Sequence, residues 1–66
     1  MSENSQKLEI LKKLIGTDVQ VTIKFDGGYT KAWVIAAPNE LQCVFALDKS
    51  RSRTTTKPVD DVISLN

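Results

Sequence analysis

The 66-residue sequence contains no histidine and a single cysteine. Without histidine, common zinc sites and histidine-based general acid–base chemistry are excluded. One cysteine cannot form a disulfide within the chain. Cys43 lies on the apolar face of an alternating segment, which favours a small buried side chain over a nucleophile or metal ligand. The adjacent acids Asp60 and Asp61 fit a turn, so we expect no enzyme and no cofactor.

The sequence also lacks an apolar run long enough for a transmembrane helix. Its first residues, MSENSQK, lack the basic and apolar regions of a secretion signal. Together with the lone cysteine, this predicts a cytoplasmic protein in a reducing compartment, with no membrane partner.

So short a chain is expected to form one domain, spanning residues 1–66. It buries only roughly 60% of its unfolded surface, so a monomer would be marginally stable. Oligomerisation is the remaining source of support, because a disulfide and a common zinc site are both excluded.

Apolar periodicity predicts a short helix over residues 1–16, with Leu8, Leu11 and Ile15 on one stripe and Gly16 as its terminator. Alternation predicts strands over 18–25, 29–37 and 40–48. The turn between the first two is Asp26-Gly27-Gly28, and Pro38-Asn39-Glu40 breaks the second run.

The middle strand is apolar on both faces from Ala32 onward, so it is either covered on both sides or bent across two halves of a barrel. The small Ala32 at its centre suits a strongly curved strand. A basic loop, KSRSR, follows, and Thr54 begins a fourth strand. A tight helical turn is expected after Pro58, then a last strand over 62–65. The prediction is a mainly β fold: a short N-terminal helix (1–16) and a five-stranded, strongly bent antiparallel small barrel (18–66).

This pattern resembles the Sm and Sm-like family, which includes the bacterial Hfq proteins. The family begins with a short helix that ends near a glycine, as LKKLIG does at 11–16. Gly27 matches the glycine of the first turn, and Val34 matches an apolar position in the bent strand.

The chain departs from the family motifs at several positions. Ala32 stands where the bent strand usually has glycine, and Asn39 stands for the usual acid. Leu41-Gln42 replaces Met-Asn. The Arg-Gly signature of the second motif is missing, with Lys57-Pro58 or Pro58-Val59 in its place.

The resemblance implies a homo-oligomeric ring of about five to seven subunits, in which the fourth strand of one subunit pairs with the fifth of the next. It also implies single-stranded RNA on the pore face. Carried over by position, the RNA-binding residues are Asn39, Leu41, Gln42 and Lys57. Gln42 has the donor and acceptor to read a base edge, and Lys57 could contact a phosphate.

Each of these residues also has a simpler interpretation. Leu41 could belong to the core, Gln42 could be a solvated strand residue, and Lys57 a solvated charge in a turn. Lys49, Arg51 and Arg53 form a further candidate RNA-binding group, because a ring would multiply their positive field; a solvated loop is the alternative. Tyr29 and Trp33 share a strand face, where they could stack on bases, form a protein interface or pack under the helix.

Two other functions stay open. One is a structural or protein-interaction barrel without nucleic-acid activity, which the missing Arg-Gly signature favours. The other is a monomeric small barrel of the Tudor or ribosome-associated kind.

Overall fold

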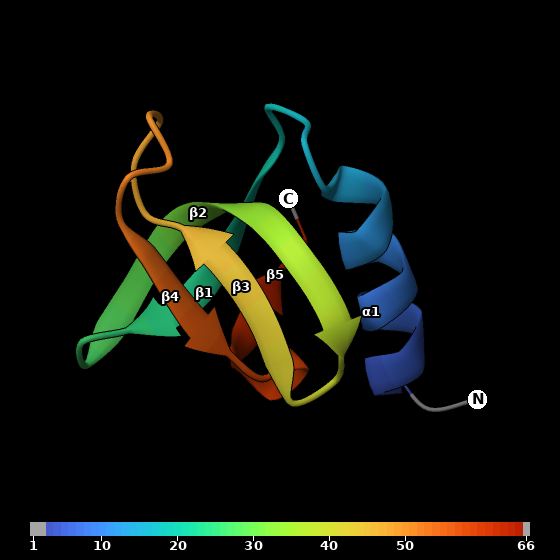
Figure 1. Ribbon diagram of the computed structural model, residues 1–66. Coiled ribbons are helices and arrows are strands. Elements are labelled where there is room, and N and C mark those ends of the chain that lie inside the picture. Colours follow the sequence, from blue (N-terminus) through green and yellow to red (C-terminus); the bar gives the residue numbers. More distant parts are fainter. Residues whose placement is uncertain (1–2, 66) are drawn as a thin grey trace.

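The computed structural model describes residues 3–65, which form one α-helix followed by five β-strands (Figure 1). Residues 1 and 2 of the predicted helix lie outside the described residues. The elements are α1 (Glu3–Leu14), β1 (Gln20–Phe25), β2 (Gly28–Asn39), β3 (Gln42–Ala46), β4 (Thr54–Lys57), the 3-10 helix η1 (Val59–Asp61) and β5 (Val62–Ser64). The predicted order, with a tight helical turn after Pro58, is confirmed.

Two glycines adopt the backbone conformations that their positions require. Gly16 follows α1 with φ +79°, the left-handed conformation typical of a helix terminator. In the β1–β2 turn, Asp26 and Gly27 both have positive φ, at 51° and 79°, as a two-residue hairpin turn needs. Gly16 and the Asp26-Gly27 pair therefore correctly predicted where the helix and the first strand end.

The strands form one antiparallel sheet in the order β4-β3-β2-β1-β5. Strand β2 is its centre, because its first half pairs with β1 and its second half with β3. The register with β3 shifts between Val34 and Ala36 and again between Ala36 and Asn39. Pro38 lies in the second shift and has no partner in the register, so the strand continues through it without a ladder bond. The expectation that the strand ends before Pro38 was wrong.

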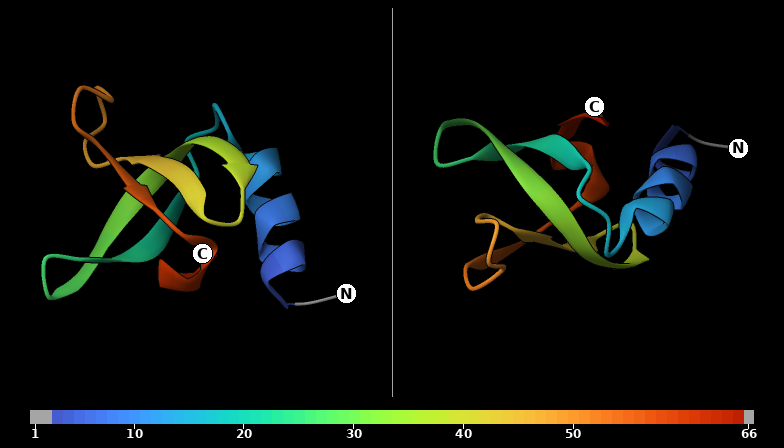
Figure 2. Two further views of the ribbon diagram at one scale, coloured as in Figure 1. Left: turned by 60° about the horizontal axis from the view of Figure 1, so that its bottom comes forward. Right: turned by 90° about the horizontal axis from the view of Figure 1, so that it is seen from above.

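Strands β4 and β5 are the two edges of the sheet, and among residues 3–65 no ladder joins them. Pro58 and η1 carry the chain from one edge to the other (Figure 2). The mainly β, five-stranded antiparallel prediction is confirmed, but the sheet is neither closed nor strongly curled. The small barrel therefore goes beyond what this structure shows.

The core lies between the sheet and α1, which packs against β2 and η1. Leu11 is the buried residue of the helix, and Leu8 and Leu14 pack beside it. The buried side chains of the cluster come from every element except β4: Leu11, Val21, Ile23, Ala32, Val34, Ala37, Cys43, Phe45, Val59 and Val62. The helix thus completes a core that the sheet alone leaves open.

We expect Leu11→Ala to lower the free energy of unfolding by about 2–5 kcal/mol, because it leaves a cavity under the helix. Ile10, its neighbour in α1, is 41% exposed, so Ile10→Ala should lower it by no more than about 1 kcal/mol. Urea unfolding followed by tryptophan fluorescence measures both. Equal losses for the two variants would contradict the docking of α1 through Leu11.

Candidate nucleic-acid interface

The turn between β2 and β3 holds three of the predicted RNA-binding residues. Asn39 ends β2 and Gln42 begins β3, and the two are partners in the ladder. The Asn39 side-chain oxygen accepts hydrogen bonds from the backbone N–H groups of Leu41 (2.9 Å) and Gln42 (3.0 Å). Asn39 therefore closes the turn as an Asx turn does, and its acceptor oxygen is used inside the protein.

Leu41 and Gln42 are both exposed. Leu41 is 77% exposed, so the alternative that it belongs to the core is wrong. It has no aromatic ring and could contribute only an aliphatic contact to a base, less than an aromatic stack of about 1–3 kcal/mol. Gln42 presents an amide at the start of β3. The turn thus offers one apolar and one hydrogen-bonding side chain to a ligand.

Lys57 lies at the same end of the sheet as this turn. It ends β4 and pairs with Cys43 of β3. The N–H of Val59 donates to the carbonyl of Glu40 at 2.8 Å, which holds the chain after β4 against the turn. The structure therefore places Lys57 and the β2–β3 turn together, although they are far apart in sequence.

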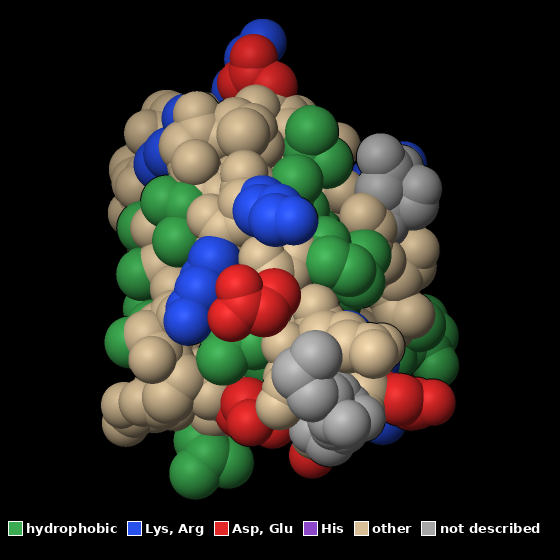
Figure 3. Space-filling model, turned by 90° about the vertical axis from the view of Figure 1, so that its right-hand side faces the viewer, with side chains coloured by type: hydrophobic (Ala, Val, Ile, Leu, Met, Phe, Trp, Pro, Cys, Tyr) green, Lys and Arg blue, Asp and Glu red, His purple; other side chains and the backbone are tan. Residues whose placement is uncertain are grey.

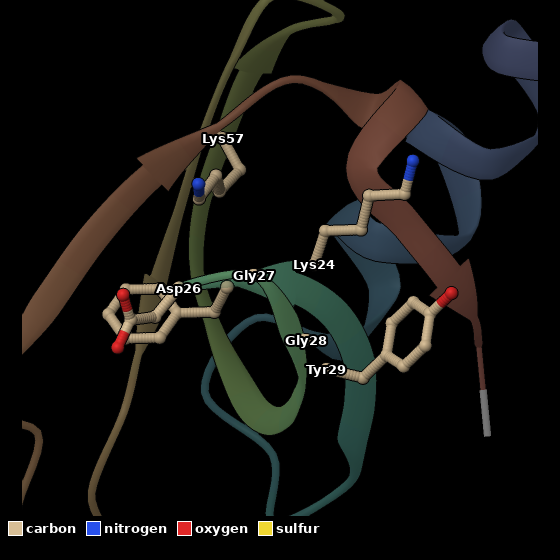
Figure 4. Close-up of a pocket in the computed structure, with 7 residues that line it drawn as sticks. Lys24, Asp26, Gly27, Gly28, Tyr29 and Lys57 are labelled. Atoms are coloured by element: carbon tan, nitrogen blue, oxygen red, sulfur yellow. The ribbon is translucent and has the colours of Figure 1, made fainter.

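The ammonium group of Lys57 is directed to the β1–β2 hairpin. Its Nζ lies 5.7 Å from the centre of the Phe25 ring, within the range of a cation–π interaction. This side chain borders an open hollow of about 320 Å³. Figure 4 draws the residues that line it. The hollow is lined by Lys24, Phe25, Asp26, Gly27, Gly28, Tyr29 and Lys57. Lys57 is thus partly engaged by an aromatic ring.

Sequence reasoning missed Lys24, which flanks the hollow together with Tyr29. The two are partners across β1 and β2, and Tyr29 is 68% exposed, so it does not pack under α1. The signal was present in the sequence. A two-residue turn at Asp26-Gly27 fixes the hairpin register, and that register pairs position 24 with position 29.

Lys49, Arg51 and Arg53 lie in the loop between β3 and β4, at the other end of these strands. Arg51 has a positive φ of 62°, and its Nη2 donates to the carbonyl of Thr17 at 3.0 Å. This bond ties the loop to the connection between α1 and β1. Lys49 and Arg53 are exposed, and neither has an ion-pair partner within residues 3–65. The predicted residues therefore form two groups at opposite ends of β3.

Asp48 organises the basic loop. Its carboxylate accepts from the hydroxyl of Ser52 (2.7 Å) and from the backbone N–H groups of Ser52 (2.9 Å) and Arg53 (3.4 Å). The Ser52 hydroxyl bond is the main cause that lowers the pKa of Asp48; slight desolvation opposes it, and the backbone bonds and the Ser50 side chain add to it. The hydrogen bonds of this loop therefore favour the ionised form of Asp48.

Cys43 has none of the surroundings of a reactive thiol. Its Sγ donates to the carbonyl of Asn39 at 3.3 Å, and burial raises the pKa of the thiol.

Within residues 3–65 no three side chains of the metal-ligating acids, cysteine or histidine are grouped to hold an ion. In the same part of the chain no helix has the length and apolar character needed to cross a membrane.

Comparison with known proteins gave no match to a protein-family model, to a curated protein or to a solved structure.

The loop should respond to acid through Asp48. Because the pKa of Asp48 is lowered in the folded protein, the stabilisation that its carboxylate provides is fully present above the pKa of the unfolded chain. This stabilisation is lost as pH falls through the pKa of the folded protein. An NMR titration of the Ser52 and Arg53 amides should therefore show a step below the usual range of aspartate. Asp48→Asn should remove that step, and an unchanged step in this variant would contradict the assignment.

Proposed function

We propose that this chain is an Sm-like subunit that assembles into a ring and binds single-stranded RNA on the pore face. The observation that carries the proposal is the strand order, which leaves β4 and β5 as the two edges of one sheet. Pairing of β4 with the β5 of a neighbour would give both edges a partner strand. It would also join the sheets of successive subunits into a closed ring. The marginal size of the chain supports such an assembly.

The placement of the polar residues supports the RNA-binding part. The exposed Leu41 and Gln42 lie at the end of the sheet where β4 leaves it, beside Lys57. In a ring this group would repeat once in every subunit. Individually weak contacts to a flexible strand would then act together through effective concentration. The second group, Lys49 and Arg53, would add a repeated positive field at the other end of β3.

A second candidate is a structural or protein-interaction module without nucleic-acid activity. Several internal contacts favour it. The Asn39 oxygen serves the turn, the Arg51 guanidinium serves Thr17, and the Lys57 ammonium lies over Phe25. These groups would have to give up or share internal partners to bind RNA.

The two candidates differ in their response to RNA oligomers and salt. We expect U-rich or A-rich fluorescent RNA to bind at micromolar protein, with an affinity that falls steeply as salt rises, because phosphate contacts release counterions. Gln replacements of Lys57, Lys49 or Arg53 should each weaken binding by roughly 3- to 10-fold and reduce the salt dependence. Fluorescence anisotropy measures both quantities.

Lys13→Gln is the matched control, because Lys13 is an exposed lysine in the last turn of α1 that belongs to neither group. It should leave RNA binding unchanged. A ring that shows no salt-sensitive binding at micromolar protein would support the interaction module instead. A mass that stays near 7.3 kDa would favour the monomeric small barrel over both candidates.

A further inference from the structure

The two edges of the sheet are unequal. Strand β4 pairs with β3 at all four of its residues, without a shift in register. Strand β5 has three residues and pairs with β1 at two positions, with a register shift between them. A regular, β-branched edge such as Thr54–Lys57 is well suited to accept another strand. The β5 edge is shorter and less regular, and one of its carbonyl groups already accepts a hydrogen bond from another element.

The backbone of Val62 shows how that edge is occupied. Its N–H donates to the carbonyl of Val59, within the 3-10 turn. Val62 is only 1% exposed, so the carbonyl of this residue is covered within the fold. Lys7 of α1 reaches this carbonyl, with its Nζ donating at 3.3 Å.

A second contact holds the same part of the helix in place. The Asn4 side-chain amide donates to the Asp60 carboxylate of η1 at 2.8 Å. This bond is exposed, and the Lys7 bond is at the long end of hydrogen-bond distances, so both are weak. The side of the molecule that carries α1 mixes basic, acidic and hydrophobic side chains without a field of one sign (Figure 3).

We propose that the first half of α1 is a latch on the β5 edge, and that the occupant of this edge is the β4 strand of a second copy of the chain. Lys7 holds the Val62 carbonyl and has to leave before Thr54–Lys57 of the neighbour pairs along β5. This inference rests on the proposed ring, in which β4 meets the neighbouring β5. It adds that assembly is opposed by an internal contact and is tuned by the position of the helix.

The test compares Lys7→Met with Lys13→Met, two changes of the same charge on the same helix. Lysine and methionine have similar helix propensities, so neither change should melt α1. Lys13 has no described contact with β5 and is exposed. Light scattering and sedimentation velocity over a range of protein concentrations give the concentration at which half of the chains are assembled.

We expect Lys7→Met to assemble at a concentration roughly 3- to 10-fold lower than the wild type, because one charged hydrogen bond no longer competes with the incoming strand. Lys13→Met should match the wild type, and Lys7→Arg, which keeps a donor, should stay close to it. If the wild type assembles but Lys7→Met is unchanged or weaker, or if Lys13→Met shifts equally, the latch is wrong and the ring stands. If all of these proteins remain at 7.3 kDa, both the ring and the latch are wrong.

Discussion

The two edges of the sheet, β4 and β5, are the constraint on which the rest of this structure depends. Every other strand has a neighbour on both sides. Each edge group needs water or another strand as a partner, and in a chain this small the missing pairing is a large part of the possible stability. The helix contacts one of these edges through the hydrogen bond from Lys7 to the Val62 carbonyl. The β4 edge has no comparable cover among the described residues.

This constraint connects the fold to the candidate site. The residues that could contact RNA lie where β3 and β4 begin and end, so any neighbour that pairs with β4 would be placed next to them. One subunit alone presents little: an exposed leucine, an exposed glutamine, and a lysine partly engaged by Phe25. Such a site gains strength mainly by repetition. We therefore propose that edge pairing and RNA binding depend on each other, and we expect a monomer to have little affinity for RNA.

Local features could be predicted from the sequence because a few neighbouring residues determine them. Gly16, the Asp26-Gly27 turn and the helical turn after Pro58 are of this kind. The continuation of β2 through Pro38 could not be predicted, because it depends on a register shift against β3. The open sheet was missed for a similar reason, since closure depends on which edges meet.

The same distinction applies to the candidate site. The side-chain environments of Lys57 and Arg51 depend on Phe25 and Thr17, which are distant in sequence. The exposure of Leu41 was left open, because an alternating pattern does not show where a strand becomes a turn. The pairing of Lys24 with Tyr29, by contrast, follows from the hairpin turn and could have been read from the sequence.

Amide hydrogen exchange along Thr54–Lys57, measured by NMR or mass spectrometry at high and low protein concentration, tests the central claim most directly. An antiparallel neighbour bonds to alternate residues, so we expect the outward-facing amides of this strand to be protected at high concentration and to exchange quickly on dilution. The amides that bond to β3 should be protected at both concentrations. Fast exchange of the outward amides at every concentration would contradict assembly through the β4 edge.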